Sequence, residues 1–159
     1  MNPANRPFLA PATAWAVSSV AARMREWDRR EIFATRVDDD PDRLALAILA
    51  TPGPAWVAWI GDDPVAAIGL APMWPGVMSP WCFGTDRFRQ VHLLLTRLAR
   101  TVIIPNARAA GAHRLEVKTM DGHEDAQRWM LKTFRAKHEG THPKFGQSGE
   151  TFHTFALIL

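Results

Sequence analysis

Two apolar runs joined by a short turn lie in the middle of the chain, and they constrain the fold more than any other feature. Ala55–Ile60 and Val65–Leu70 are separated by Gly61-Asp62-Asp63-Pro64. Short apolar runs on either side of a Gly/Asp/Pro turn are typical of a β-hairpin. A second turn at Met73–Gly76 and a third run at Met78–Phe83 extend the hairpin into a meander. The centre of the chain is therefore predicted to be antiparallel sheet.

Helical periodicity flanks this meander on both sides. Apolar residues recur at helical spacing, Pro41 stands at a suitable first position of a helix, and Pro105 must kink or break the helix that contains it. The predicted helices are Ala14–Phe33, a second from Pro41 that ends before Pro52, a long third that starts after Gly84-Thr85-Asp86, and Glu124–Lys137.

The remaining strands complete an alternating pattern. They are predicted at Pro7–Ala12, His113–Met120, 138–145 and 151–158. The order is therefore β-α-α-β-β-β-α-β-α-β-β in a single domain over residues 1–159, with residues 1–6 as a loose leader. This order predicts a mixed α/β sheet with helices on its faces. It resembles the element order of the GNAT acetyltransferase fold.

Composition excludes several classes of protein. The single cysteine, Cys82, rules out an internal disulfide and a cysteine-built zinc or iron–sulfur site. A net charge of +3 is too mild to indicate specific nucleic-acid binding. The apolar stretches are far shorter than the ~20 residues of a membrane span, and the start lacks a signal peptide. We therefore expect a protein made in a cytoplasm, with no membrane span. The absence of tyrosine removes every mechanism that needs a phenol.

Three segments resemble, in order and spacing, the acetyltransferase-like proteins of short-tailed bacteriophages, a family that includes internal virion proteins of podoviruses. They are Pro80–Asp86, His123–Phe134 and Glu150–Phe155. The resemblance implies a virion or assembly protein that binds other virion proteins near the internal core and portal, in one or several copies. Trp74 and Trp81 are the candidate interface residues, since tryptophan is enriched at binding hot spots; the alternative for Trp74 is a loop residue folded back on the sheet.

The resemblance to GNAT proteins also implies a cofactor loop that the chain does not have. GNAT enzymes hold the acetyl-CoA pyrophosphate on a loop of the type Q/R-x-x-G-x-G/A, where backbone amides at a helix N-terminus face the phosphates. The corresponding stretch, Asp86–Val91, has no glycine and carries Phe88 and Val91 instead. Arg87 and Arg89 are the candidate cofactor-binding residues if acetyl-CoA binds. Otherwise they form a solvated basic turn.

The resemblance implies a missing acid as well. Many GNAT enzymes protonate the leaving thiolate with a tyrosine on the last helix, and the matching position here is Trp129, whose indole cannot fill that role. Glu116 and Asp86 are the remaining candidates for a base. The two departures favour a protein without catalytic residues or a bound cofactor.

Three functions stay open at this point. The first is a bacteriophage virion or assembly protein with a degenerate acetyltransferase fold. The second is an acetyl-CoA-dependent N-acetyltransferase of an unknown amine, with Arg87 and Arg89 on the cofactor. The third is a phage protein that binds a host target.

Two further motifs carry less weight. His138-Glu139-Gly140-Thr141-His142 matches the zinc-protease pattern H-E-x-x-H, which requires a helix. Gly140 and the following Pro143 place it in a strand, so no metal site is expected. Cys82 with His92 or His113 could form a nucleophile pair, but a buried apolar cysteine is the simpler interpretation.

Overall fold

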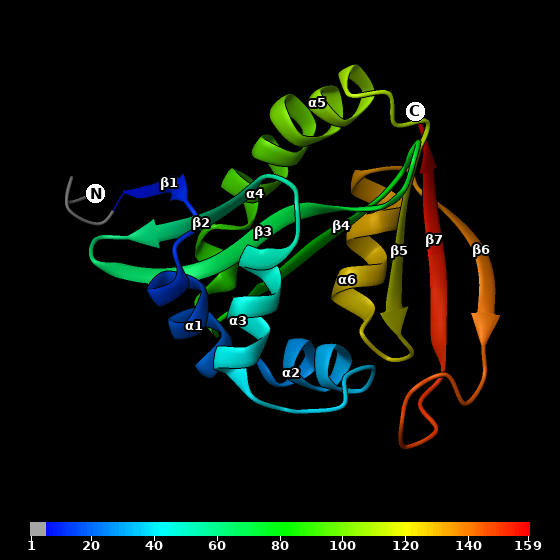
Figure 1. The fold of residues 1–159 in the computed structure, drawn as a ribbon, viewed down its shortest axis with the longest axis horizontal. Helices are drawn as coiled ribbons and strands as arrows, with labels where there is room; N and C mark the ends of the chain where they lie inside the picture. The colour runs from blue at the N-terminus through cyan, green and yellow to red at the C-terminus, as the bar shows by residue number, and fades with distance from the viewer. Residues whose placement is uncertain (1–5) are drawn as a thin grey trace.

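A single seven-stranded sheet forms the centre of the protein. The structure is a computed structural model that describes residues 6–159, so most of the leader predicted at 1–6 lies outside it. The strand order is β1-β2-β3-β4-β5-β7-β6 (Figure 1). The strands are β1 Pro7–Pro11, β2 Ala55–Ile60, β3 Asp63–Trp74, β4 Val77–Gly84, β5 Arg114–Met120, β6 Lys137–His142 and β7 Phe152–Ile158. Neighbouring strands are antiparallel except for β4 and β5. The predicted mixed α/β fold and the central meander are confirmed.

Helices cover both faces of this sheet. They are α1 Ala14–Ala22, α2 Glu26–Phe33, α3 Pro41–Ala50, α4 His92–Leu98, α5 Ile104–Ala109 and α6 Glu124–Arg128. Side chains of β3 alternate between the faces: Ala67 packs with α1 and α3, whereas Ala66 and Ile68 pack with α4. Two apolar layers therefore sandwich the sheet. No helix within residues 6–159 is long and apolar enough to cross a bilayer.

The helix predicted over Ala14–Phe33 is in fact two helices, and this prediction is wrong in an informative way. The chain leaves α1 after Ala22, and Met24 forms an isolated bridge with Thr85. The Arg25 amide then donates to the Gly84 carbonyl at 2.8 Å. These long-range bonds replace helical ones, and they hold α2 against the end of β4.

Pro105 disturbs its helix as predicted. The chain runs from α4 through a π-helical turn at Ala99–Ile103 into α5, where Pro105 stands in the first turn. Because proline has no N–H, the wide turn accommodates the missing hydrogen bond. The predicted helix over Glu124–Lys137 likewise starts as α6 and ends in a π-helical turn at Trp129–Thr133.

Candidate functional site between β4 and β5

Among residues 6–159, β4 and β5 are the only neighbouring strands that run parallel, and they diverge along most of their length. β4 and β5 pair at Val77 with Arg114 and at Met78 with Leu115, and then separate (Figure 1). A cavity of about 1050 Å³ lies at this gap. Its lining includes residues of β4, β5, α2, α4 and α6, and further residues from α3, β3 and β7. The gap is therefore a built feature of the sheet, closed at one end and open at the other.

The edge of β4 that faces the gap offers unpaired backbone groups. Gly84 shows which way the backbone points: its N–H donates to Asp28 and its C=O accepts from the Arg25 amide, so both groups point away from β3. Backbone direction alternates along a strand, so Cys82 N–H and C=O and the Pro80 carbonyl face the same side. Pro80 is tolerated in mid-strand because its missing N–H would point into the gap rather than toward β3.

One turn of α2 connects the separated ends of the two strands. Asp28 Oδ2 accepts the Gly84 N–H of β4 at 2.8 Å, and Glu31 Oε2 accepts the Met120 N–H of β5 at 2.7 Å. Asp28 is 3% exposed. The spacing of two carboxylates on one helix therefore sets the width of the open end.

His123 lies between these two carboxylates. Its Nδ1 is 2.9 Å from Glu31 Oε2, and its Nε2 is 3.6 Å from Asp28 Oδ1. The imidazole stacks on Trp27 with ring centroids 5.8 Å apart. Arg25 completes the cluster: it donates to both oxygens of Asp28, and its guanidinium lies 4.0 Å above the Phe88 ring.

Sequence reasoning did not identify this cluster. A signal existed for Glu31, because it continues the apolar stripe of Met24 and Trp27 at helical spacing. A charged residue on a buried stripe is usually paired. Its partners, Met120 N–H and His123, are 89 and 92 residues away, and nothing local indicates them.

The loop between β4 and α4 is closed on itself. The amides of Phe88, Gln90 and Val91 donate to carbonyls of the same loop, at 2.9, 2.9 and 3.0 Å. Phe88 and Val91 are buried in the core at 6% and 0% exposure. This stretch therefore does not present a row of free amides to an anion.

The two arginines predicted to contact a phosphate have different environments. Arg87 donates to Asp63 Oδ2 at 2.6 Å, so its charge is already paired. Arg89 is exposed and lines the cavity. The role of both arginines in cofactor binding stays a prediction. Arg89 is the better placed of the two, because it is exposed at the cavity and Arg87 is paired with Asp63.

Trp129 uses its only side-chain donor inside the protein. The indole Nε1 donates to Thr96 Oγ1 at 3.0 Å, and its rings contact those of Phe88 and His92. Burial, with a smaller contribution from Arg25, lowers the pKa of His92 below its ordinary value. His92 also lines the cavity, and a lowered pKa favours the neutral form of its imidazole at pH 7.

The other candidate acids, bases and nucleophiles are less suited to catalysis. Burial alone would raise the pKa of Glu116, but its hydrogen bonds to Arg114 and Lys118 lower it, so it is a weak base. Asp86 is exposed. Burial raises the pKa of the Cys82 thiol well above its usual range, which keeps it protonated.

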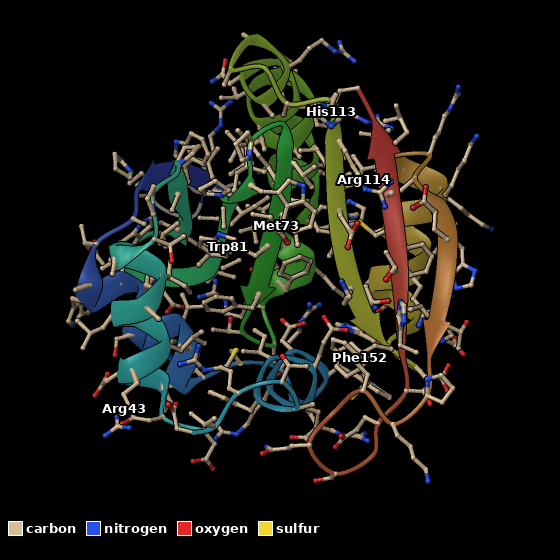
Figure 2. The ribbon with its side chains drawn as sticks, turned by 45° about the vertical axis from the view of Figure 1, so that its right-hand side comes forward. Arg43, Met73, Trp81, His113, Arg114 and Phe152 are labelled. Carbon is tan, nitrogen blue, oxygen red and sulfur yellow. The ribbon has the colours of Figure 1, made fainter. Side chains whose placement is uncertain are left out.

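His113 is not placed to activate Cys82. It lies near Arg114, at the end where β4 and β5 pair (Figure 2). Cys82 is at the open end of β4 instead. Among residues 6–159, no hydrogen bond joins Cys82 to His113 or His92.

The two candidate interface tryptophans differ in accessibility. Trp74 is 56% exposed at the end of β3, so it is not folded back on the sheet. Trp81 packs over Gly69, where a Cβ would clash with its indole, and stacks on Phe83. A partner would reach Trp74 more easily than Trp81. Their interface role stays a prediction.

Similarity to solved structures extends over nearly the whole chain. No sequence family model and no curated protein matches it. An N-acetyltransferase from Staphylococcus aureus Mu50 is 15% identical, with a TM-score of 0.77 over 96% of this chain and 98% of that one. An acetyltransferase of the GNAT family from Streptococcus pneumoniae is 11% identical, with a TM-score of 0.66 over 97% and 100%.

A third similar structure was solved with a ligand. The yncA protein from Salmonella typhimurium, with its cofactor acetyl-CoA, is 12% identical, with a TM-score of 0.70 over 98% of this chain and 95% of that one. At these identities the similarity shows the fold: the chain has the GNAT fold expected from its element order. These structures do not connect the chain to bacteriophage particles.

Proposed function

We propose that the chain is an acetyl-CoA-dependent N-acetyltransferase whose cofactor arm lies between β4 and β5. The observation that carries this proposal is the gap itself, where an unpaired strand edge faces a cavity of about 1050 Å³. A purely structural sheet would close this gap by strand pairing, since an unpaired edge leaves polar backbone groups without partners. The chain instead maintains the gap with the buried carboxylate of Asp28 and the partly buried carboxylate of Glu31.

The extended arm of acetyl-CoA can form hydrogen bonds with this strand edge. The arm is a narrow chain that carries secondary amides, and these can pair with Cys82 N–H and C=O as an added β-strand would. Small-molecule pockets span about 300–1000 Å³, so the cavity is large enough. When bound, acetyl-CoA would supply the acetyl group as a thioester.

The loop between β4 and α4 is less suited to the phosphates of acetyl-CoA than the rest of the gap is to the cofactor arm. Because the loop amides are bonded internally, side chains must supply the positive charge. Arg89 and Lys132 are exposed and line the cavity from α4 and α6 sides. Exposed charges are screened by salt. We therefore expect cofactor binding that weakens strongly as ionic strength rises.

His92 is the residue best suited to move a proton. An amine must lose a proton to become acetylated, and a neutral imidazole accepts one near pH 7. His92 meets that requirement because burial lowers its pKa. A ring nitrogen of His92 would take the proton directly or through water.

Thermal melting with millimolar acetyl-CoA tests binding. A ligand at 100 times its Kd adds about 2.7 kcal/mol of stability, an easily measured increase in Tm. The double variant Arg89→Ala/Lys132→Ala should lose most of that increase, whereas Arg97→Ala, an exposed arginine of α4 that does not line the cavity, should keep it. Release of the coenzyme A thiol in the presence of a panel of amines then tests turnover.

The virion-assembly role is the second candidate, and the self-closed loop at Phe88–Val91 supports it. A protein that had lost its cofactor would need no exposed amides there. Unchanged melting at millimolar acetyl-CoA, no thiol release, and presence of the chain in purified phage particles would favour this role. Recovery from host lysate of a single bacterial protein would instead favour the host-target role.

A further inference from the structure

A pair of histidines on the last two strands lies outside the site between β4 and β5. His138 on β6 and His153 on β7 direct ring nitrogens toward each other, with Nε2 of the first 3.3 Å from Nδ1 of the second. Thr141 Oγ1 lies 3.4 Å from that Nε2 and 3.1 Å from that Nδ1. Three potential metal-binding atoms therefore form a nearly equilateral triangle.

The size of the triangle matches tetrahedral coordination. Zinc binds imidazole nitrogen at about 2.0–2.1 Å, which places adjacent ligand atoms of a tetrahedron about 3.3–3.4 Å apart. The three edges of 3.1, 3.3 and 3.4 Å fall at or near this value. The two imidazole nitrogens could occupy two corners, and the Thr141 hydroxyl and water could complete the tetrahedron.

A carboxylate orients one of the two imidazoles for metal binding. Nε2 of His153 is 2.9 Å from Asp121 Oδ1. A carboxylate accepts a hydrogen, so the ring proton lies on Nε2 and the Nδ1 lone pair faces His138. Carboxylate–histidine–metal arrangements of this kind fix the tautomer and raise the basicity of the ligand.

A β-bulge brings the ligands to one face. Residues three apart on a regular strand point to opposite faces, but the register of β6 shifts between His138 and Gly140. The extra residue turns His138 and Thr141 to the same side. Because β6 is the edge strand and His138 is exposed, an ion can reach them.

The second histidine of the H-E-x-x-H motif does not take part. Nε2 of His142 is 2.7 Å from Thr154 Oγ1, on the face opposite His153. Within residues 6–159, no group of three or more His, Cys, Asp or Glu side chains forms a metal site. The site therefore has two imidazoles rather than the full set of a buried structural zinc.

We infer that His138, His153 and Thr141 form an open surface site for a divalent transition metal of the zinc type, with Asp121 as the orienting carboxylate. The bound ion would cross-link the edge strand β6 to β7. The inference is independent of the proposed acetyltransferase function, because neither histidine lines the cavity between β4 and β5.

Calorimetric titration of the untagged chain with Zn²⁺ tests the site, with Co²⁺ absorption as a second readout. We expect one ion per chain, at least tenfold weaker binding in His138→Ala and in His153→Ala, and about 10–100-fold weaker binding in Asp121→Asn. His142→Ala is the matched control and should bind as the wild type does. Zn²⁺ should raise the Tm of the wild type but not that of His138→Ala.

Two results would overturn the inference. One is absence of Zn²⁺ binding by the wild type at millimolar concentration. The other is binding that His142→Ala reduces as much as His138→Ala does, or that survives both His138→Ala and His153→Ala. His138 is exposed on an edge strand, so its variant should fold, and a melt in chelator confirms folding.

Discussion

Asp28 and Gly84, 56 residues apart in the chain, are joined by a 2.8 Å hydrogen bond from the Gly84 N–H to the buried Asp28 carboxylate. The same carboxylate is paired with Arg25, which in turn covers Phe88. One side chain thereby ties together α2, the end of β4 and the loop after it. The open end of the β4–β5 gap depends on this contact.

Removing that carboxylate should destabilise the whole domain. Asp28→Ala leaves the Gly84 N–H and the Arg25 guanidinium without their partner, and breaking a buried pair costs about 3 kcal/mol. Urea unfolding measures the loss. Glu26→Gln, an exposed position of the same helix, should change the free energy of unfolding by less than about 0.5 kcal/mol. Equal losses in both variants would contradict the role given to Asp28.

Asp63 should make stability depend on acid pH. Burial alone would raise its pKa, but hydrogen bonds and charge from Arg23 and Arg87 lower it below 3.8. A carboxyl with a lowered folded-state pKa stabilises the fold above its unfolded pKa, and this stability is lost as pH falls through the folded value.

The variant Asp63→Asn isolates that contribution. The partly exposed pairs are worth up to about 1 kcal/mol, so the variant should be less stable than the wild type by that amount at pH 7. The difference should shrink toward pH 3. Urea unfolding at the two pH values measures it, and a difference that stays constant with pH would count against the pairing.

His92 should control the pH profile of acetyl transfer, if the proposed function holds. Its pKa is lowered from 6.5 by burial and by Arg25, so the neutral form persists to mildly acidic pH. We expect kcat/KM to fall below that range and His92→Gln to lose about 100-fold activity. His113→Gln, at the paired end of the strands, should keep the wild-type profile. An unchanged profile in His92→Gln would exclude His92 as the proton acceptor.

Trp129 and Thr96 should be energetically coupled. The indole donates to the buried Thr96 hydroxyl at 3.0 Å, and a hydrogen bond of this kind contributes about 1 kcal/mol. A double-mutant cycle with Trp129→Phe and Thr96→Val measures the coupling free of each substitution's packing cost. Additive effects of the two substitutions would show that the bond contributes nothing to stability.

Local patterns predicted most of the fold, because hairpins, caps and apolar stripes are set by neighbouring residues. The hairpin turn, predicted at Gly61–Pro64, is found at Gly61-Asp62, and the strand predicted at His113–Met120 is found at Arg114–Met120. The division of the first helix was missed, since it depends on distant partners: Met24 forms a bridge with Thr85, 61 positions away, and the Arg25 amide donates to Gly84, 59 positions away. No local pattern distinguishes a helix that is broken by tertiary contacts from a continuous one.

The candidate site was predicted only in part. The absence of glycine at Asp86–Val91 predicts a loop unsuited to the usual phosphate contacts, because backbone access depends on local residue size. In the structure the amides of Phe88, Gln90 and Val91 donate to carbonyls of the same loop. The strand gap and the Asp28–Glu31 tie could not be predicted, because a strand's neighbours depend on the whole topology. Arg87 and Arg89 look equivalent in the sequence. They differ in the structure because Arg87 is paired with Asp63, which is distant in the sequence.

The tie between α2 and the two strands also bears on how a ligand would enter the gap. Since Asp28 and Glu31 hold β4 and β5 apart before anything binds, the conformational entropy of fixing the gap is lost during folding rather than on association. A ligand of suitable cross-section would bind to the preorganised gap without a preceding slow conformational change. The same rigidity would make the gap selective for the cross-section of the ligand: an unbranched chain would fit, and a branched one would be excluded.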